Sequence, residues 1–287
     1  MGSGLDNARL HRGRPSGMSE PSRTVDNQPA LSFTDGFIGD VLGPIAFDHA
    51  LRRVIAFASS PRSGFLAYDL AGHAARASGR LDEVGPWTLL LADALAGRVA
   101  VGDIDGFIRN LDAFVDLLVE VPDVDLAAMN DDQLARVIDL CTFGFSGVWA
   151  PKITKVATLY RPRAVPVLDG YMALAFGYAR EGFSYGVKPR RRAIERVVRA
   201  LAVQTRAQAP ILAKLRRTAQ VMVPEIRRVS ELRLVDIIIW TSQDDRMKRP
   251  GKRLDAWLTV EPMEPPRLDQ IRWLSAIGLN RNQGSTR

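Results

Sequence analysis

The pattern of apolar and polar positions predicts helices along most of the chain from about Leu31 onward. Between Asp103 and Val121 the apolar side chains recur at three- and four-residue steps, which is typical of one amphipathic helix. The stripe consists of Ile104, Phe107, Ile108, Leu111, Phe114, Val115 and Leu118. No run of alternating β-branched residues is long enough for a sheet. The pattern therefore predicts an all-α fold.

Further helices are predicted from residues that commonly begin or end them. Asn130 is expected to cap a helix that runs to Gly144. Pro210 is expected to open a helix of its own, because proline fits the first helical turn. Ser230 is expected to cap another helix. Apart from the helix after Asn130, these predicted helices span residues 190–207, 210–222, 231–240 and 268–277.

The ends of the chain differ in composition from the rest. Residues 1–30 are rich in Gly, Ser, Arg and Pro and lack the apolar core of a secretory signal, so they are predicted to be disordered. Residues 31–280 are predicted to form a single helical domain, with an acidic half over 31–150 and a basic half over 151–280 that contains the hairpin. A disordered tail is predicted over 281–287.

Charge changes the picture because the two halves differ in sign. Residues 1–150 hold 12 Lys and Arg against 20 Asp and Glu, a net charge of −8. Residues 151–287 hold 27 against 12, a net charge of +15. A surface that neutralises several phosphates binds nucleic acid without reading its sequence, so duplex DNA is the leading predicted partner. The alternative is that the acidic half partly neutralises these arginines within the fold.

Composition excludes several classes of protein. The longest strongly apolar run, from Leu234 to Trp240 and interrupted by Asp236, is far shorter than the ~20 residues of a membrane helix. The single cysteine, Cys141, excludes a disulfide within the chain and a thiolate-rich metal site, and the three histidines lack metal-binding spacing. We therefore expect a cytoplasmic protein, associated with the nucleoid if it binds DNA, with no metal and no cofactor.

The stretch from Phe143 to Phe176 carries most of the candidate chemistry. A helix that ends at Gly144 is followed by a glycine-containing turn and by a short helix from Pro151 to Tyr160, so the two helices are predicted to form a hairpin. Two prolines then prevent the second helix from continuing. Asp169 follows at the predicted start of a further helix, where its carboxylate would face the hairpin.

Two lysines lie in the second helix of this hairpin. Lys152 and Lys155 are about 60° apart around the helix axis. Both are predicted to stand clear of the inward apolar stripe, which consists of Ile153, Val156, Ala157 and Tyr160.

The residues that set this stretch apart are Gly147, Val148, Lys152, Arg161, Pro162, Ala164, Val165, Pro166, Val167 and Asp169. Their order resembles the helix-hairpin-helix DNA glycosylases of base excision repair, in which a Gly-Val-Gly hairpin with a lysine in its second helix precedes a Pro-Val-Asp turn. The same stretch also resembles an uncharacterised family of actinobacterial proteins. The resemblance covers about 35 of the 287 residues. It departs from the glycosylase pattern at Trp149, which replaces the second glycine, and at Leu168, which is an extra residue.

The resemblance implies a DNA glycosylase that removes a damaged base by N-glycosidic cleavage, with or without lyase activity. It assigns a phosphate grip to Gly147 and Val148, and to Asp169 the stabilisation of positive charge on the sugar. It assigns the attacking amine to Lys152, with Lys155 as its substitute. Further contacts to DNA are expected from Trp149, Lys155, Arg161, Arg163, Arg192 and Arg196.

Simpler roles stay open for the same residues. Asp169 can act only as a helix cap, the lysines can be phosphate contacts or solvated charges, and Trp149 can pack against its own helices. Two other functions follow from these simpler roles. One is a non-catalytic helix-hairpin-helix DNA-binding module, and the other is a protein-interaction module with no role in nucleic acid binding.

Overall fold

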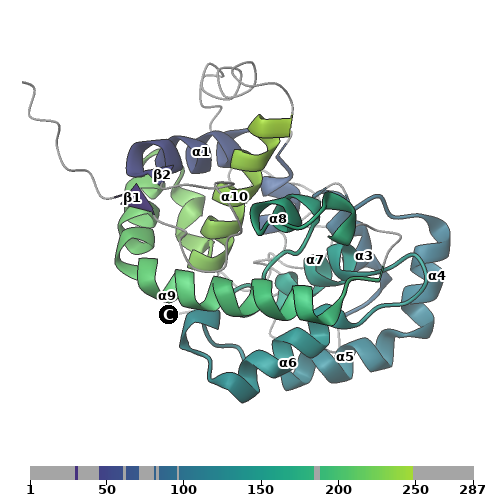
Figure 1. Cartoon of the computed structure of the whole chain (residues 1–287). Coiled ribbons are helices and arrows are strands. Elements are labelled where there is room, and N and C mark those ends of the chain that lie inside the picture. The colour runs from purple at the N-terminus through teal and green to yellow at the C-terminus, as the bar shows by residue number, and fades with distance from the viewer. Residues whose placement is uncertain are drawn as a thin grey trace, which may run out of the picture.

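The computed structural model describes residues 30–31, 45–60, 63–70, 81, 84–95, 97–183 and 188–247. These residues are mostly helical, which confirms the predicted all-α class (Figure 1). The α-helices are α1 (Phe47–Ser59), α3 (Pro86–Asp93), α4 (Val101–Arg109), α5 (Leu111–Glu120), α6 (Asp131–Thr142), α7 (Ala150–Tyr160), α8 (Gly170–Ala175), α9 (Arg191–Met222) and α10 (Glu231–Met247).

Shorter elements connect these helices. A π-helical turn, η2 (Phe65–Leu70), follows α1, and the 3-10 turns are η4 (Leu126–Ala128), η5 (Arg180–Phe183) and η6 (Pro224–Arg228). Two strands of two residues each, β1 (Ala30–Leu31) and β2 (Ile45–Ala46), pair antiparallel. Within the described ranges no helix is long and apolar enough to span a membrane.

Local capping determines several helix ends as the sequence predicts. The Asn130 side chain accepts a hydrogen bond from the Gln133 N–H at 2.9 Å, and the Gln133 side chain accepts one from the Asn130 N–H at 3.1 Å. Ser230 Oγ accepts from the Arg233 N–H at 3.1 Å, which confirms the predicted cap of α10. The helix continues beyond Trp240 to Met247, so its predicted end was too early.

The single helix predicted between Asp103 and Val121 is wrong, because α4 and α5 are separated at Asn110. This residue has φ −114° and ψ 13°, and its Nδ2 donates to the Gly106 carbonyl at 2.8 Å. Such competition with the backbone for hydrogen bonds disfavours a continuous helix at Asn. The break lets Phe107 and Phe114 approach to 5.3 Å between ring centroids, both fully buried.

The predicted boundary at Pro210 is also wrong, because α9 continues through this residue. Pro210 is exposed, while Leu201 before it and Leu212 after it are fully buried in the same core. Packing of both halves therefore outweighs the cost of about 3 kcal/mol that proline imposes inside a helix. The helix predicted over 268–277 lies outside the described residues.

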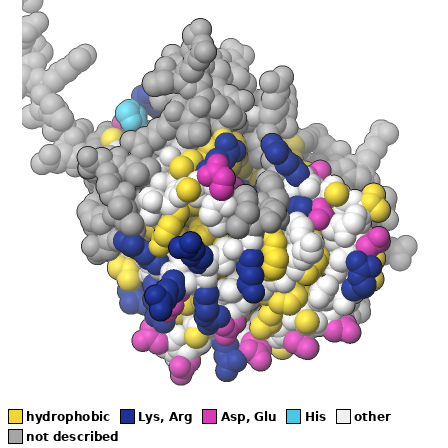
Figure 2. Space-filling model, turned by 45° about the vertical axis from the view of Figure 1, so that its right-hand side comes forward, with side chains coloured by type: hydrophobic (Ala, Val, Ile, Leu, Met, Phe, Trp, Pro, Cys, Tyr) yellow, Lys and Arg dark blue, Asp and Glu magenta, His cyan; other side chains and the backbone are white. Residues whose placement is uncertain are grey.

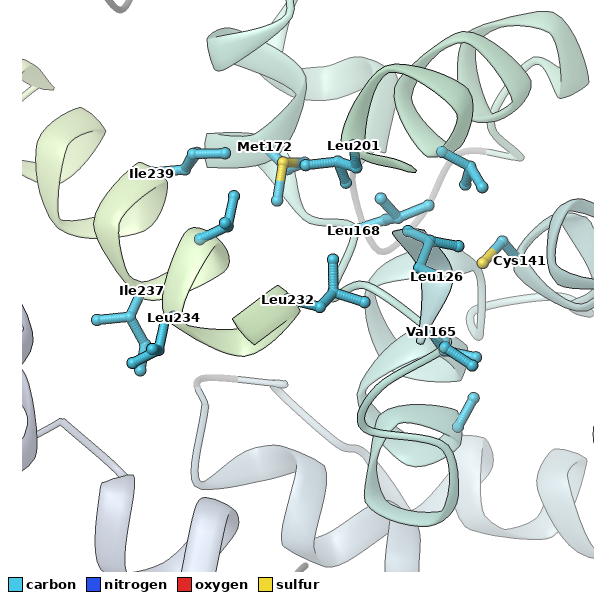
Figure 3. Packing of buried hydrophobic residues seen from close by; sticks show 14 of the residues in the cluster. Leu126, Cys141, Val165, Leu168, Met172, Leu201, Leu232, Leu234, Ile237 and Ile239 are labelled. Atoms are coloured by element: carbon cyan, nitrogen blue, oxygen red, sulfur yellow. The ribbon is translucent and has the colours of Figure 1, made fainter. Parts of the chain in front are cut away.

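Helix α7 occupies the centre of the fold, and each of its residues is buried (Figure 1). Figure 3 shows the packing beside it, where Ile239 of α10 points toward Met172 of α8 and Met172 points toward Leu201 of α9. A helix that is covered on all sides has no face left for solvent. Lys152 and Lys155 were predicted to stand clear of the inward apolar stripe. Both side chains are nevertheless buried, because the face of α7 that carries them is also covered.

Two threonines of α7 hold the segment that follows it. Thr158 Oγ1 donates to the Val165 carbonyl at 3.0 Å, and Thr154 Oγ1 accepts from the Leu168 N–H at 3.0 Å. These bonds fasten residues 165–168 along the helix. Asp169 is thereby placed next to the turn of α7 that carries Lys155.

Candidate active site

Lys152 forms a buried ion pair with Asp103 of α4. Its Nζ lies 2.6 Å from Asp103 Oδ2, and the two side chains are 4% and 10% exposed. The same Nζ donates to the Gly147 carbonyl at 3.1 Å, and Asp103 Oδ2 also accepts from the Ala100 N–H at 2.7 Å. Lys152 thus joins α7, the glycine turn and the start of α4. These contacts give the lysine a structural role.

The glycine turn packs against the same aspartate. Gly147 has φ +83°, a conformation that residues with a side chain rarely adopt. A Cβ at this position would lie 2.9 Å from Asp103 Oδ1. The Val148 N–H, which the resemblance assigns to a phosphate, donates instead to the Phe145 carbonyl at 2.9 Å.

Lys155 lies one turn further along α7 and lines a cavity. Its side chain is among the most deeply buried in the described part of the chain, at 1% exposure, and its Nζ donates to the Leu95 carbonyl at 2.7 Å. Burial lowers the pKa of this amine, against the opposing influence of the carboxylates of Asp169 and Asp236. A lysine with a lowered pKa holds more of the neutral, nucleophilic form at neutral pH.

Asp169 caps a helix and also lines the cavity, so its position is compatible with both the structural and the catalytic role. Its Oδ1 accepts from the N–H groups of Tyr171 and Met172 at 2.9 and 3.1 Å, which makes it the N-cap of α8. The residue is only half-buried and lines the same cavity as Lys155. The cap fixes one carboxylate oxygen and thereby orients the group within the cavity.

Helix α10 adds two charged residues to the cavity wall. Arg233 Nε and Nη2 donate to Asp69 of η2 at 2.7 and 3.1 Å, and Nη1 donates to Asp236 through a short hydrogen bond. The guanidinium also lies 5.6 Å from the ring centroid of Phe57 and 5.5 Å from that of Tyr68. Arg233 is therefore held by two carboxylates and two aromatic rings.

Burial raises the pKa of Asp236 to about 7, although Arg233 opposes this effect. The charges of Asp169 and Asp69 add to the increase. At neutral pH both the protonated and the ionised form of this carboxyl group are therefore populated.

The cavity combines these charges with an apolar wall. Its volume is about 80 Å³, and the lining includes Phe57, Val167, Ile237 and Trp240 beside Lys155, Asp169, Arg233 and Asp236. An amine, two carboxylates and a guanidinium in one largely apolar cavity form a pattern typical of acid–base and nucleophilic sites.

Two arginines that were predicted to contact DNA form hydrogen bonds to backbone carbonyls of the protein instead. Arg161 Nε donates to the Val121 carbonyl at 2.8 Å, and burial lowers the pKa of its guanidinium. Arg163 donates to the Asp123 carbonyl and lies 3.6 Å from the Asp123 carboxylate. Both arginines fasten the loop after α7 to the loop after α5.

The other predicted contacts lie closer to the surface. Arg192 and Arg196 are exposed on α9 and form no ion pair within the described part of the chain. Trp149 is half-buried, and Lys188 Nζ lies 5.7 Å from the centroid of its ring. Trp149 is therefore partly covered by the protein itself, with Lys188 beside its ring. The two arginines, in contrast, present their charge to solvent.

Part of the basic half is neutralised by ion pairs with acidic side chains at the surface of the same chain. Arg191 and Arg199 of α9 pair with Asp139 and Asp131 of α6 at 2.5 and 2.6 Å. Figure 2 shows Lys and Arg side chains gathered on the left of one face, with Asp and Glu along its lower edge. The surface thus retains a basic region beside these ion pairs.

Sequence reasoning missed Asp69, Arg233 and Asp236 as site residues. A signal for Asp236 was present, because it interrupts the apolar run that ends at Trp240. A carboxylate in such a run is buried on any helix and needs a cation beside it. Its partner Arg233 lies three residues earlier, whereas the pairing with Asp69 joins positions 164 residues apart.

The fold and the cavity define a helical protein with a buried lysine among carboxylates. The chain belongs to a family of unknown function (DUF6308), whose profile matches residues 51–243. The matched range includes each cavity residue from Phe57 to Trp240. Searches of curated proteins and of solved structures found no match to the chain.

Proposed function

We propose that this protein binds duplex DNA and removes a damaged base by N-glycosidic cleavage, with Lys155 as the attacking amine and Asp169 as the carboxylate at the reacting sugar. The observation that carries the proposal is that these two side chains line one cavity. Reacting groups must share one site, and these do. Lys152 is not the amine in this proposal because Asp103 and Gly147 hold it.

The chemistry follows from the environment of each group. Burial lowers the pKa of the Lys155 amine, which favours the neutral form that can attack C1′ of a nucleotide. Positive charge develops on the sugar as the base leaves, and a fixed carboxylate stabilises it. Asp169 suits this role because its capping bonds hold one oxygen while the residue remains half-exposed at the cavity.

The cavity also limits what enters it. Its volume of about 80 Å³ is about half that of an engineered cavity of ~150 Å³ that holds benzene. The reacting carbon of the sugar and its immediate neighbours fit such a space, and a whole base does not. In this proposal the departing base therefore stays outside the cavity.

Charge supports DNA as the partner. The net charge of +15 over residues 151–287 favours a polyanion, and Arg192 and Arg196 present two exposed cations on α9. The Pro-Val-x-Asp segment that resembles the glycosylases leads directly into the cavity at Asp169. Association with the nucleoid would follow from such binding.

The experiment incubates the full chain with duplexes that each carry one oxidised, deaminated or alkylated base. Base release is measured for the wild type, Asp169→Asn and Lys155→Met. The asparagine amide can still accept from the Tyr171 and Met172 N–H groups, so Asp169→Asn removes the charge and keeps the cap. We expect it to slow release at least about 100-fold with nearly unchanged DNA binding.

Binding measured over a series of salt concentrations separates the other two functions. A steep negative slope of log affinity against log salt without release of any base would identify a non-catalytic DNA-binding module. No salt-dependent binding would remove DNA from the account and leave a protein-interaction module. The double variant Arg192→Gln/Arg196→Gln is expected to lose about two phosphate contacts, and the slope should become shallower by about two.

A further inference from the structure

A second carboxylate in the cavity has no part in the proposed attack. Asp236 lies on α10, lines the same cavity as Lys155 and Asp169, and is 4% exposed. Buried acids are costly unless paired, and this one is kept at the cavity wall by its bond to Arg233. Because it lines the same cavity as the buried amine of Lys155, it is placed to exchange a proton with groups that react there.

We propose that Asp236 is the proton donor for imine formation at Lys155, and that Arg233 and Asp69 are positioning residues that hold its carboxyl group in the cavity. The proposal rests on the proposed function in one respect, namely that Lys155 acts as an amine nucleophile. It deepens that function by naming a second substrate class for the same amine, an aldehyde such as the open form of a sugar that has already lost its base.

The positioning is visible in the contacts of Arg233. Arg233 donates two N–H groups to Asp69, at 2.7 and 3.1 Å, and a third to Asp236. Phe57 and Tyr68 lie against the guanidinium and limit its movement. A carboxylate bound to so constrained a partner keeps its orientation through the reaction.

The protonation of Asp236 depends on the groups that face it from each neighbouring element. Arg233 is on its own helix, Asp69 and Tyr68 are on η2, Asp169 precedes α8, and Lys155 is on α7. Burial raises its pKa to about 7, so that a large fraction carries a proton at neutral pH. A donor with a pKa near the working pH is the most effective general acid.

Imine formation at Lys155 takes two stages, addition of the amine and loss of water. The neutral Lys155 amine attacks the aldehyde carbon, the N–C bond forms, and a proton passes from nitrogen to the former carbonyl oxygen to give a carbinolamine. Asp236 then donates its proton to the hydroxyl group, the C–O bond breaks, and water leaves. The products are a protonated imine on Lys155 and an ionised Asp236, which recovers its proton when the imine is hydrolysed.

The test uses a small aldehyde, so that it does not depend on DNA binding. Glycolaldehyde with saturating sodium cyanoborohydride converts each imine into a stable adduct, and peptide mass spectrometry of the full-length protein gives the rate at Lys155. Lys214 is exposed on α9 and serves as the internal reference in the same digest. Rates are measured from about pH 5 to about pH 9.

The wild-type rate at Lys155, relative to Lys214, is expected to follow a bell-shaped pH profile, because it requires a neutral amine and a protonated Asp236. Asp236→Asn should abolish the decline at high pH and lower the maximum about 100-fold. A rate in this variant equal to that of the wild type, with the same profile, would overturn the role of Asp236 while Lys155 remains the amine.

A second variant keeps the test decisive if Asp236→Asn does not fold. The charge of Asp69 raises the pKa of Asp236, whereas the largest charge effects on the pKa of Lys155 come from Asp169, Asp236 and Arg233. Asp69→Asn should therefore move the limb of the profile set by Asp236 toward lower pH. An unmoved profile would overturn the proposal. If wild-type Lys155 forms no adduct, the proposed function fails together with this inference.

Discussion

Replacement of Lys152 separates a structural lysine from a catalytic one. Lys152→Met leaves the Asp103 carboxylate, which is 10% exposed, with the Ala100 N–H but without its cation. Removal of one partner from a buried ion pair destabilises a protein by about 3–5 kcal/mol, since the other charge stays buried and uncompensated. For a domain of this size that corresponds to a fall of roughly 6–20 °C in melting temperature.

Urea denaturation followed by circular dichroism measures the effect, and Asp103→Asn provides the matched partner for a double-mutant cycle. The double variant should lose less stability than the sum of the two single variants, because the pair acts as one unit. A free energy of unfolding for Lys152→Met within about 1 kcal/mol of the wild type would refute the buried ion pair. Loss of base release without loss of stability would return the catalytic role to Lys152.

Three further results are expected. Asp169→Ala should destabilise the protein by about 1 kcal/mol through loss of the cap, whereas Asp169→Asn should cost less, as measured by thermal unfolding. Gly147→Ala should cost about 1–2 kcal/mol by the same measurement, because φ is +83° and the new Cβ would meet Asp103. Burial raises the pKa of Asp236 from 3.8 to about 7, so the stability it contributes is full below about pH 4 and is lost as the pH rises to about 7. Asp236→Asn should remove that decline in urea titrations performed over this pH range.

Local features of the sequence predicted several helix starts correctly. Asn130, Asp169 and Ser230 each cap the helix that follows them, because capping depends on a few adjacent residues. Helix ends that depend on packing were less predictable. The continuity at Pro210 is decided by the core on which both flanking turns pack, whereas the break at Asn110 comes with a side-chain hydrogen bond to the Gly106 carbonyl that the apolar pattern does not reveal.

The choice between the two lysines could not be made from the sequence. An amphipathic pattern assumes that the opposite face of the helix meets solvent, and α7 has no such face. Lys152 is paired with a residue 49 positions earlier, and Lys155 lines a cavity built from α1, α7 and α10 together with the loop before α8. Contacts between positions so far apart arise only when the helices pack together.

The most direct test of the account is to identify the lysine that reacts. The full-length protein is incubated with a duplex that carries one abasic site, sodium borohydride is added, and the cross-linked peptide is sequenced by mass spectrometry. The account predicts a cross-link on Lys155 that is lost in Lys155→Met. A cross-link on Lys152, or one that persists in Lys155→Met, would contradict it.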